Sequence, residues 1–209
     1  MPIYKSSEFK GFGFNYDQSQ QPFFKAIVKE NLRLLNTLPT GKLILSAIRK
    51  AKPANRSNFP DGINVMLQPP LTRGWSTPGL GATSGKITDQ KKYDDFQQGK
   101  GKLIPGISAK TQVQEEDKKT AADGTGSVAT LFYSNNEMLS DTGTWFIPHI
   151  TMGHELIHCL HSLLGEMDPD NRKEEYKTVG MKGYAGTYTE NMLRADANYP
   201  QRTKYFADD

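Results

Sequence analysis

The sequence predicts one α+β domain, with a small mixed sheet and flanking helices, and three observations support this class. Apolar residues recur at helical spacing in residues 22–38 and again in 40–52. Two short segments, 63–67 and 127–134, have the composition of strands and are bounded by turn sequences. A third helical segment, 153–165, follows the second strand and contains three of the four histidines. We expect these elements to share one hydrophobic core.

Length and composition narrow the class of protein. A chain of 209 residues can bury a full core as one domain. Its net charge of +3 is too small and too dispersed to indicate a nucleic-acid partner. No apolar run approaches a membrane span, and residues 1–10 lack the hydrophobic region of a signal peptide. Cys159 is the only cysteine, so no intramolecular disulfide can form. We expect a monomer that does not use the classical secretory route.

The start of the chain predicts a tail followed by two helices. Residues 1–21 are polar and interrupted by glycine, which predicts a flexible leader that could serve as a secretion or targeting segment. Pro22 suits the start of a first helix, which runs to Leu38. Thr40 is a candidate N-cap for the second helix, which Pro53 must end. We therefore take residues 22–209 as the folded domain.

A large insertion separates the two predicted strands. Residues 68–126 are rich in glycine, proline and lysine, which predicts an irregular segment that either forms a binding surface or is disordered. Trp75 either contacts a partner there or anchors the loop to the core. Residues 127–134, SVATLFYS, then provide the strongest strand signal in the chain.

The third helical segment carries a candidate metal site, His154-Glu155-Leu-Ile-His158. In a helix, two histidines four residues apart project from one face about one turn, or roughly 6 Å, apart. Both rings can then bind one ion, while Glu155 can reach a water molecule on that ion. Zinc suits this set because it keeps a position open for water and lowers the pKa of that water to about 7. The pattern predicts metal-assisted hydrolysis.

Some alternatives remain open at this motif. A chance HExxH has a probability on the order of 1 per cent in a chain with so few histidines. His161 lies roughly 10 Å from His154 along the axis, so we interpret it as a supporting or core residue. A carboxylate from a second helix usually completes such a site, and spacing alone does not choose among Glu174, Glu175 and Glu190.

The strand before this helix also has a predicted role. In zinc metallopeptidases such a strand often forms the sheet edge above the metal, where an extended peptide can add by backbone hydrogen bonds. By analogy, we expect residues 127–134 to form that edge.

Four blocks in the last third of the chain together resemble a known family. They are HELIHCLHSLLG, EEYKTVG, the segment Thr189-Glu190-Asn191 with Arg194, and the pair Arg202 and Tyr205 within RTKY. In this order they resemble the NleD-type effector metallopeptidases, which pathogenic bacteria inject through type III secretion. The first two blocks and the RxxY pair are also similar to the more distant clostridial neurotoxin light chains. The resemblance covers about residues 147–206 and does not extend to the insertion, where we expect substrate choice to reside.

The resemblance implies a zincin-like fold of the gluzincin type and assigns roles to individual residues. Glu175 would be the third zinc ligand beside His154 and His158, with Glu174 supporting the site and Glu190 as the reserve ligand. Glu155 would be the general base. The remaining assignments are to Arg202 and Tyr205, which would stabilise the oxyanion, and to Arg194, which would make a structural contact.

The resemblance also implies a substrate and a location. NleD-type effectors cleave host MAP kinases within the activation loop, so a MAP kinase is the first expected substrate. Type III delivery would place the protein in the host cell cytoplasm. Two other functions stay open: a toxin-domain peptidase with a different target, and a zinc-containing binding module without catalysis.

Overall fold

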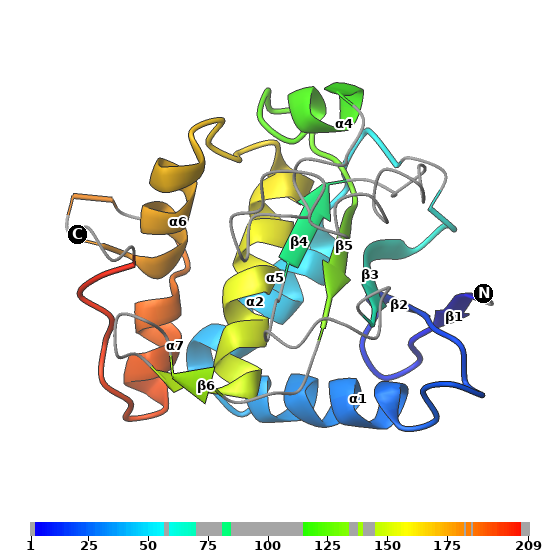
Figure 1. Ribbon diagram of the computed structural model, residues 1–209. Coiled ribbons are helices and arrows are strands. Elements are labelled where there is room, and N and C mark those ends of the chain that lie inside the picture. Colours follow the sequence, from blue (N-terminus) through cyan, green and yellow to red (C-terminus); the bar gives the residue numbers. More distant parts are fainter. Residues whose placement is uncertain are drawn as a thin grey trace, which may run out of the picture.

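The main sheet has five strands, in the order β1-β2-β3-β5-β4 (Figure 1). The computed structural model describes residues 3–56, 59–69, 81–84, 115–133, 138–139, 145–181, 183–184 and 186–205. Parallel pairing joins β2 to β3 and β3 to β5, whereas β1 and β4 are antiparallel to their neighbours. The strands span β1 Ile3–Lys5, β2 Gly11–Asn15, β3 Ile63–Gln68, β4 Gly81–Ser84 and β5 Ala129–Phe132. A separate antiparallel pair comprises β6 Met138–Leu139 and β7 Trp145–Phe146.

Helix α5 occupies the centre of the molecule (Figure 1). It packs against α1, α2, α6, α7, β4 and β5, and so touches both the sheet and the C-terminal helices. None of the described helices has the length and apolar character that crossing a membrane requires. The helices span α1 Phe24–Leu35, α2 Pro39–Lys50, α4 Glu115–Thr120, α5 Pro148–Leu164, α6 Asn171–Val179 and α7 Glu190–Asp196. The predicted mixture of helices with a small mixed sheet is confirmed.

Strand β3 is buried on both of its faces. Val65 and Leu67 point into the main core with the helices, whereas Met66 belongs to a second cluster with Ile63 and Val128. Adjacent residues of a strand point to opposite faces, which accounts for Leu67 and Met66 lying on different sides. Ile63 departs from this period, and it lies where the register between β2 and β3 is irregular. Sheet and helix are also joined at Ser127, whose backbone N–H donates to Ser162 O of α5 at 2.8 Å.

The prediction of a flexible leader over residues 1–21 is wrong for residues 3–15. This segment forms β1 and β2, and Phe12, Phe14 and Tyr16 are buried in the main core. Gly13 permits close packing, because a Cβ on it would lie 2.6 Å from Ile63 Cδ1. Gly13 therefore reflects contact between β2 and β3, whereas Gly11, at φ 93°, faces the backbone of Arg49 on α2. The aromatic residues at every second position are the strand signal.

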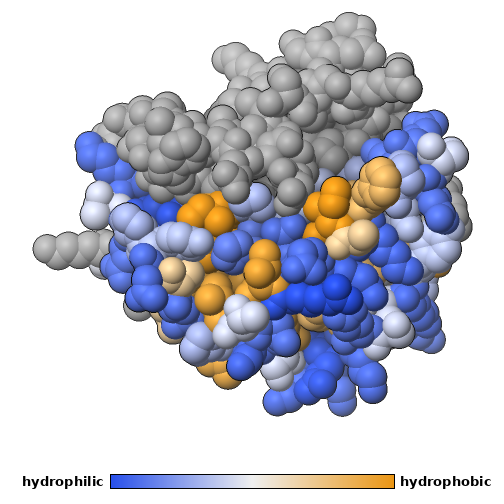
Figure 2. Space-filling view, turned by 90° about the horizontal axis from the view of Figure 1, so that it is seen from below, coloured by the Kyte–Doolittle hydropathy of each residue, from blue (hydrophilic) through white to orange (hydrophobic). Residues whose placement is uncertain are grey.

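An ion-pair group ties the turn after β1 to α1. Glu8 accepts from Arg33 Nε at 2.7 Å and from Lys29 Nζ at 2.9 Å. These hydrogen bonds, that of Arg33 first, lower the pKa of Glu8 to about 2. Figure 2 views the molecule from the side along which α1 lies, where hydrophobic residues are interspersed with charged and polar ones.

Three further expectations need correction or completion. Leu38, and not Thr40, is the N-cap of α2; the Thr40 N–H instead donates to Asp196 Oδ2 of α7 at 2.6 Å. Strand β5 pairs on both sides, with β3 and β4, so it is not the sheet edge. The predicted insertion at 68–126 includes β4 and α4, while Trp75 lies outside the described residues.

We expect Phe14→Ala to lower the free energy of unfolding by about 3–5 kcal/mol, because the ring is fully buried between β2 and the helices. Phe23→Ala removes the same ring from a site that is 72% exposed, and should change stability by no more than about 0.5 kcal/mol. Urea unfolding of both variants measures the difference. Equally small effects would mean that the N-terminal strands are not part of the cooperative core.

Candidate metal centre

Helix α5 begins and ends at residues that suit those positions. Pro148 occupies the first turn, where its missing N–H costs nothing, and Gly165 ends the helix in the left-handed conformation at φ 73°. Gly153 lies where α7 approaches, because a Cβ there would collide with Leu193 Cδ1. The helix is buried over most of its length, which brings its polar residues into the interior.

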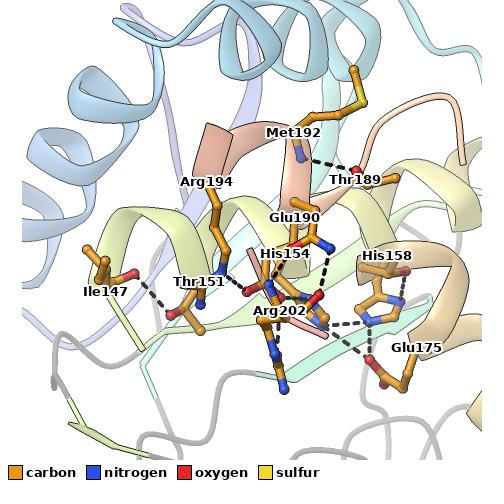
Figure 3. Close-up of polar contacts among 12 residues, drawn as sticks. Ile147, Thr151, His154, His158, Glu175, Thr189, Glu190, Met192, Arg194 and Arg202 are labelled. Carbon is orange, nitrogen blue, oxygen red and sulfur yellow. Dashed lines mark hydrogen bonds and ion pairs between the residues drawn. The ribbon is translucent and has the colours of Figure 1, made fainter. Parts of the chain in front are cut away.

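Three ligand-type atoms meet beside the middle of α5 (Figure 3). His154 Nε2, His158 Nε2 and Glu175 Oε2 form a triangle in which each pair lies 3.1 Å apart. The two rings come from successive turns of α5, and the carboxylate comes from α6. All three side chains are buried. We call this group the metal triangle.

The far nitrogen of His154 is held by a carboxylate from α7 (Figure 3). His154 Nδ1 lies 2.9 Å from Glu190 Oε2. Two buried arginines hold Glu190 in turn: Arg194 Nε donates to Oε1, and Arg202 Nη1 donates to Oε2 at 3.2 Å. Glu190, the reserve ligand of the sequence analysis, therefore lies on the opposite side of the ring from the metal triangle.

The far nitrogen of His158 has a similar partner on α6. His158 Nδ1 lies 2.8 Å from Glu174 Oε1 and 3.2 Å from Thr178 Oγ1. Glu174 also contacts His161 Nδ1 at 2.7 Å and accepts from the Asp168 N–H at 2.9 Å. His161 thus meets the carboxylate that holds His158, in agreement with its interpretation as a supporting residue.

Charges within this buried group stabilise one another. Burial disfavours a charge on His154, but hydrogen bonds to Glu175 and Glu190 outweigh that cost and raise the pKa of His154 to about 10. Burial likewise opposes ionisation of Glu175, yet the charge of His158 and the hydrogen bond from His154 hold its pKa well below the usual range. The pKa of Glu190 falls to about 2, because His154 and the two arginines outweigh burial. The carboxylates therefore favour a cation among them.

The donor set fits a zinc ion. When a carboxylate accepts a hydrogen bond from Nδ1, a neutral imidazole leaves the Nε2 lone pair free for a metal. In that form the metal triangle consists of two nitrogen lone pairs and one carboxylate oxygen, which repel unless a cation lies between them. Two imidazoles and one carboxylate are a known ligand set for catalytic zinc.

Tyr205 lies beside His154, within reach of the charge of Glu155. The Tyr205 ring stacks on His154, with ring centres 5.9 Å apart and planes 9° apart. The Arg202 guanidinium lies 4.5 Å from the centre of the Tyr205 ring. Burial, followed by the charges of Glu175 and Glu155, raises the pKa of the Tyr205 hydroxyl well above its ordinary value. That hydroxyl is therefore a proton donor at neutral pH.

Contacts thus connect five of the six residues singled out for the site, and the charge of the sixth, Glu155, acts on Tyr205. The structure also adds two groups that the motif did not indicate, Thr178 and the Asp168 N–H. Thr178 follows Glu174 by four residues, so helical spacing could have placed both on one face. The Asp168 contact depends on a loop and leaves no such pattern. Cys159 is buried, and burial raises the pKa of its thiol, as expected for a packing residue.

Comparison with protein families assigns the chain to one family. A model of effector proteins, peptidase family M91, matches residues 13–205. The chain belongs to this family, and the resemblance to effector metallopeptidases is confirmed. The match begins within β2, well before the blocks that carried the resemblance. No curated protein sequence matches the chain.

Solved structures show a similar fold. The catalytic domain of Clostridium botulinum neurotoxin serotype F matches with a TM-score of 0.51 and 16% identity, over 87% of this chain and 48% of that one. The chain therefore spans about half the length of that domain. Two light chains also match over 71% of this chain: serotype F, with a TM-score of 0.41, 17% identity and 37% of its length, and serotype HA, with 0.43, 18% and 36%. At these identities the likeness concerns the fold alone.

We expect Glu175→Gln to weaken zinc binding more than about a hundredfold, because it removes the anionic corner of the metal triangle. Glu174→Gln and Glu190→Gln should each weaken it by about 10- to 100-fold, since these carboxylates contact His158 and His154 at the nitrogens that lie away from the metal triangle. Competition with a chromophoric chelator measures all three. A larger loss for Glu190→Gln than for Glu175→Gln would reverse the assignment of the third ligand.

Proposed function

We propose that this protein is a zinc-dependent endopeptidase of the gluzincin type, in which α5 is the active-site helix. The metal triangle carries the proposal, because its three buried donor atoms lie 3.1 Å from one another, close enough to bind one ion. Family membership supports both the peptidase activity and the action as an effector. His154, His158 and Glu175 would hold the ion.

The mechanism is hydrolysis in which water attacks the peptide carbonyl directly. When held by the metal triangle, a zinc ion would supply Lewis acidity, which would polarise the carbonyl and lower the pKa of the attacking water. Glu155 accepts a proton from that water and delivers it to the amine as the carbon–nitrogen bond breaks. The Tyr205 hydroxyl, kept protonated by its raised pKa, donates to the developing oxyanion. No covalent intermediate is needed, and Cys159 takes no part.

Arg202 contributes charge and support to the same step. Its guanidinium is paired with Glu190 and lies over the Tyr205 ring. It therefore places a positive charge beside the phenol and restricts the ring that carries the donor. We assign Arg202 to oxyanion stabilisation through this arrangement.

An extended substrate would pair with β4. Among the described strands of the main sheet, β4 is the last beyond β5, and it packs against α5. A free strand edge offers backbone hydrogen bonds to an added peptide. In this binding mode the substrate pairs with β4, and not with residues 127–134 as the sequence analysis expected. The resemblance to NleD-type effectors makes a MAP kinase activation loop the first substrate to test, with the protein acting as a monomer in the host cytoplasm after type III delivery.

An unbiased cleavage experiment tests the function. Host-cell extract is incubated with the zinc-loaded protein or with zinc-loaded Glu155→Gln, and new protein N-termini are identified by mass spectrometry. Termini that require Glu155 establish a peptidase, and a cut in a MAP kinase activation loop supports that substrate. Cuts in other proteins only would favour a toxin-domain peptidase with another target. If extracts of several hosts yield no Glu155-dependent terminus while zinc is bound, a non-catalytic binding module replaces the proposal.

We expect Tyr205→Phe to lower kcat by about 10²- to 10³-fold with little change in KM, because it removes one donor to the oxyanion. Tyr199→Phe makes the same chemical change on an exposed residue of the same segment and should leave kcat unaltered. Steady-state kinetics on a peptide taken from the identified cleavage site provide the measurement. A loss confined to KM would assign Tyr205 to substrate binding only.

A further inference from the structure

Residues 197–205, which we call the C-terminal strap, carry Arg202 and Tyr205 to the metal triangle without forming a helix or strand. The strap begins directly after α7, and Asn198 takes the left-handed conformation, at φ 56°. A segment without regular hydrogen bonding keeps a defined path only if other groups bind its backbone. The contacts that hold the strap therefore determine where Tyr205 lies.

Helix α7 supplies these contacts. The Tyr199 N–H donates to Arg194 O at 2.8 Å, and Arg194 Nη1 approaches Pro200 O at 3.5 Å. The shortest tie comes from Asn191: its Oδ1 accepts from the Arg202 N–H at 2.7 Å, and its Nδ2 donates to Arg202 O at 2.9 Å. One side-chain amide thus holds both backbone groups of one residue, as a neighbouring strand would.

Arg202, whose backbone is held in this way, also contacts the Tyr205 ring and so helps to set its position. The Arg202 side chain is buried, pairs with Glu190 and lies over the Tyr205 ring, which stacks on His154. A shift of the Arg202 backbone would therefore move the guanidinium and the phenol together. Displacements of about 1 Å at such groups are enough to reduce catalysis strongly.

Asn191 is not needed to cap α7. Thr189 is the N-cap residue, and its Oγ1 accepts from the Met192 N–H at 3.2 Å. The neighbouring Glu190 contacts His154 and accepts a hydrogen bond from Arg194. Among the residues that the structure describes, the side-chain amide of Asn191 bonds only to the strap.

We propose that Asn191 is a positioning residue. It fixes the backbone of the C-terminal strap, and through Arg202 it keeps the Tyr205 ring stacked on His154. The proposal rests on the proposed peptidase function for its effect on rate, but its effect on structure can be measured independently. It assigns to Asn191 a role in transition-state stabilisation and none in zinc binding.

The test compares zinc-loaded Asn191→Ala with Met192→Ala, which truncates an exposed neighbour on the same helix. Hydrogen exchange of the Arg202 amide should become about tenfold faster in Asn191→Ala, because its acceptor is lost. We expect kcat to fall about tenfold, with KM and zinc affinity within about twofold of the unmodified protein. Met192→Ala should match the unmodified protein in every measurement.

Two further variants separate positioning from a general loss of structure. Asn191→Asp retains the acceptor for the Arg202 N–H but replaces the donor to Arg202 O by a carboxylate oxygen, so exchange at Arg202 should be slower than in Asn191→Ala and kcat should lie between those of Asn191→Ala and the unmodified protein. If Asn191→Ala does not fold, Asn191→Asp decides whether the Asn191 amide positions Arg202. In a Tyr205→Phe background, Asn191→Ala should lower kcat no further, because both changes remove the same contribution.

Several outcomes would overturn the proposal. These are unchanged exchange at Arg202, a large loss of zinc affinity, or an undiminished effect of Asn191→Ala in the Tyr205→Phe background. If the unmodified protein cleaves nothing, the proposed function fails, and hydrogen exchange at Arg202 alone decides whether Asn191 holds the strap.

Discussion

The structure depends on the burial of ionisable groups that are tolerable only in contact with one another. His154, His158 and Glu175 are buried beside α5, and each would be unfavourable there alone. Glu174 from α6 and Glu190 from α7 occupy the outer nitrogens of the two rings. Because these partners belong to three different helices, the helices must dock before the charges are compensated. The same contacts that assemble this end of the molecule therefore also prepare the metal triangle.

The rest of the fold supports this assembly. Helix α5 lies between the sheet and the C-terminal helices, so the triangle is tied to both. Gly153 permits the close approach of α7, which brings Glu190 to His154. The strap after α7 then returns over the site with Arg202 and Tyr205. In the proposed function, the central helix would carry two ligands, and separate segments would supply the third ligand and the proton donor, an arrangement suited to holding reacting groups in fixed positions.

Sequence reasoning worked where the relevant contacts are local. The four-residue spacing of His154 and His158 requires only helical geometry, and α5 has that geometry. The helices α1 and α2 were predicted from the period of their apolar residues, and the strands β3 and β5 from their composition and flanking turns. The errors concern long-range contacts. Glycines near the start of the chain were interpreted as flexibility, although Gly13 reflects the close approach of Ile63, fifty residues later. The order of strands in the sheet, which makes β5 internal, leaves no local pattern either.

What the sequence determined by itself is the identity and local spacing of the chemical groups: two imidazoles one helical turn apart, the neighbouring Glu155 and a choice of three carboxylates. The tertiary structure decided how those carboxylates are distributed, with Glu175 inside the triangle and Glu174 and Glu190 on the outer nitrogens. It also decided that the Arg202 guanidinium lies over the Tyr205 ring and that the Asn191 side chain bonds to the Arg202 backbone. The physical reason is that helical spacing fixes directions only within one element, whereas the distance between atoms of different elements depends on how their buried faces pack.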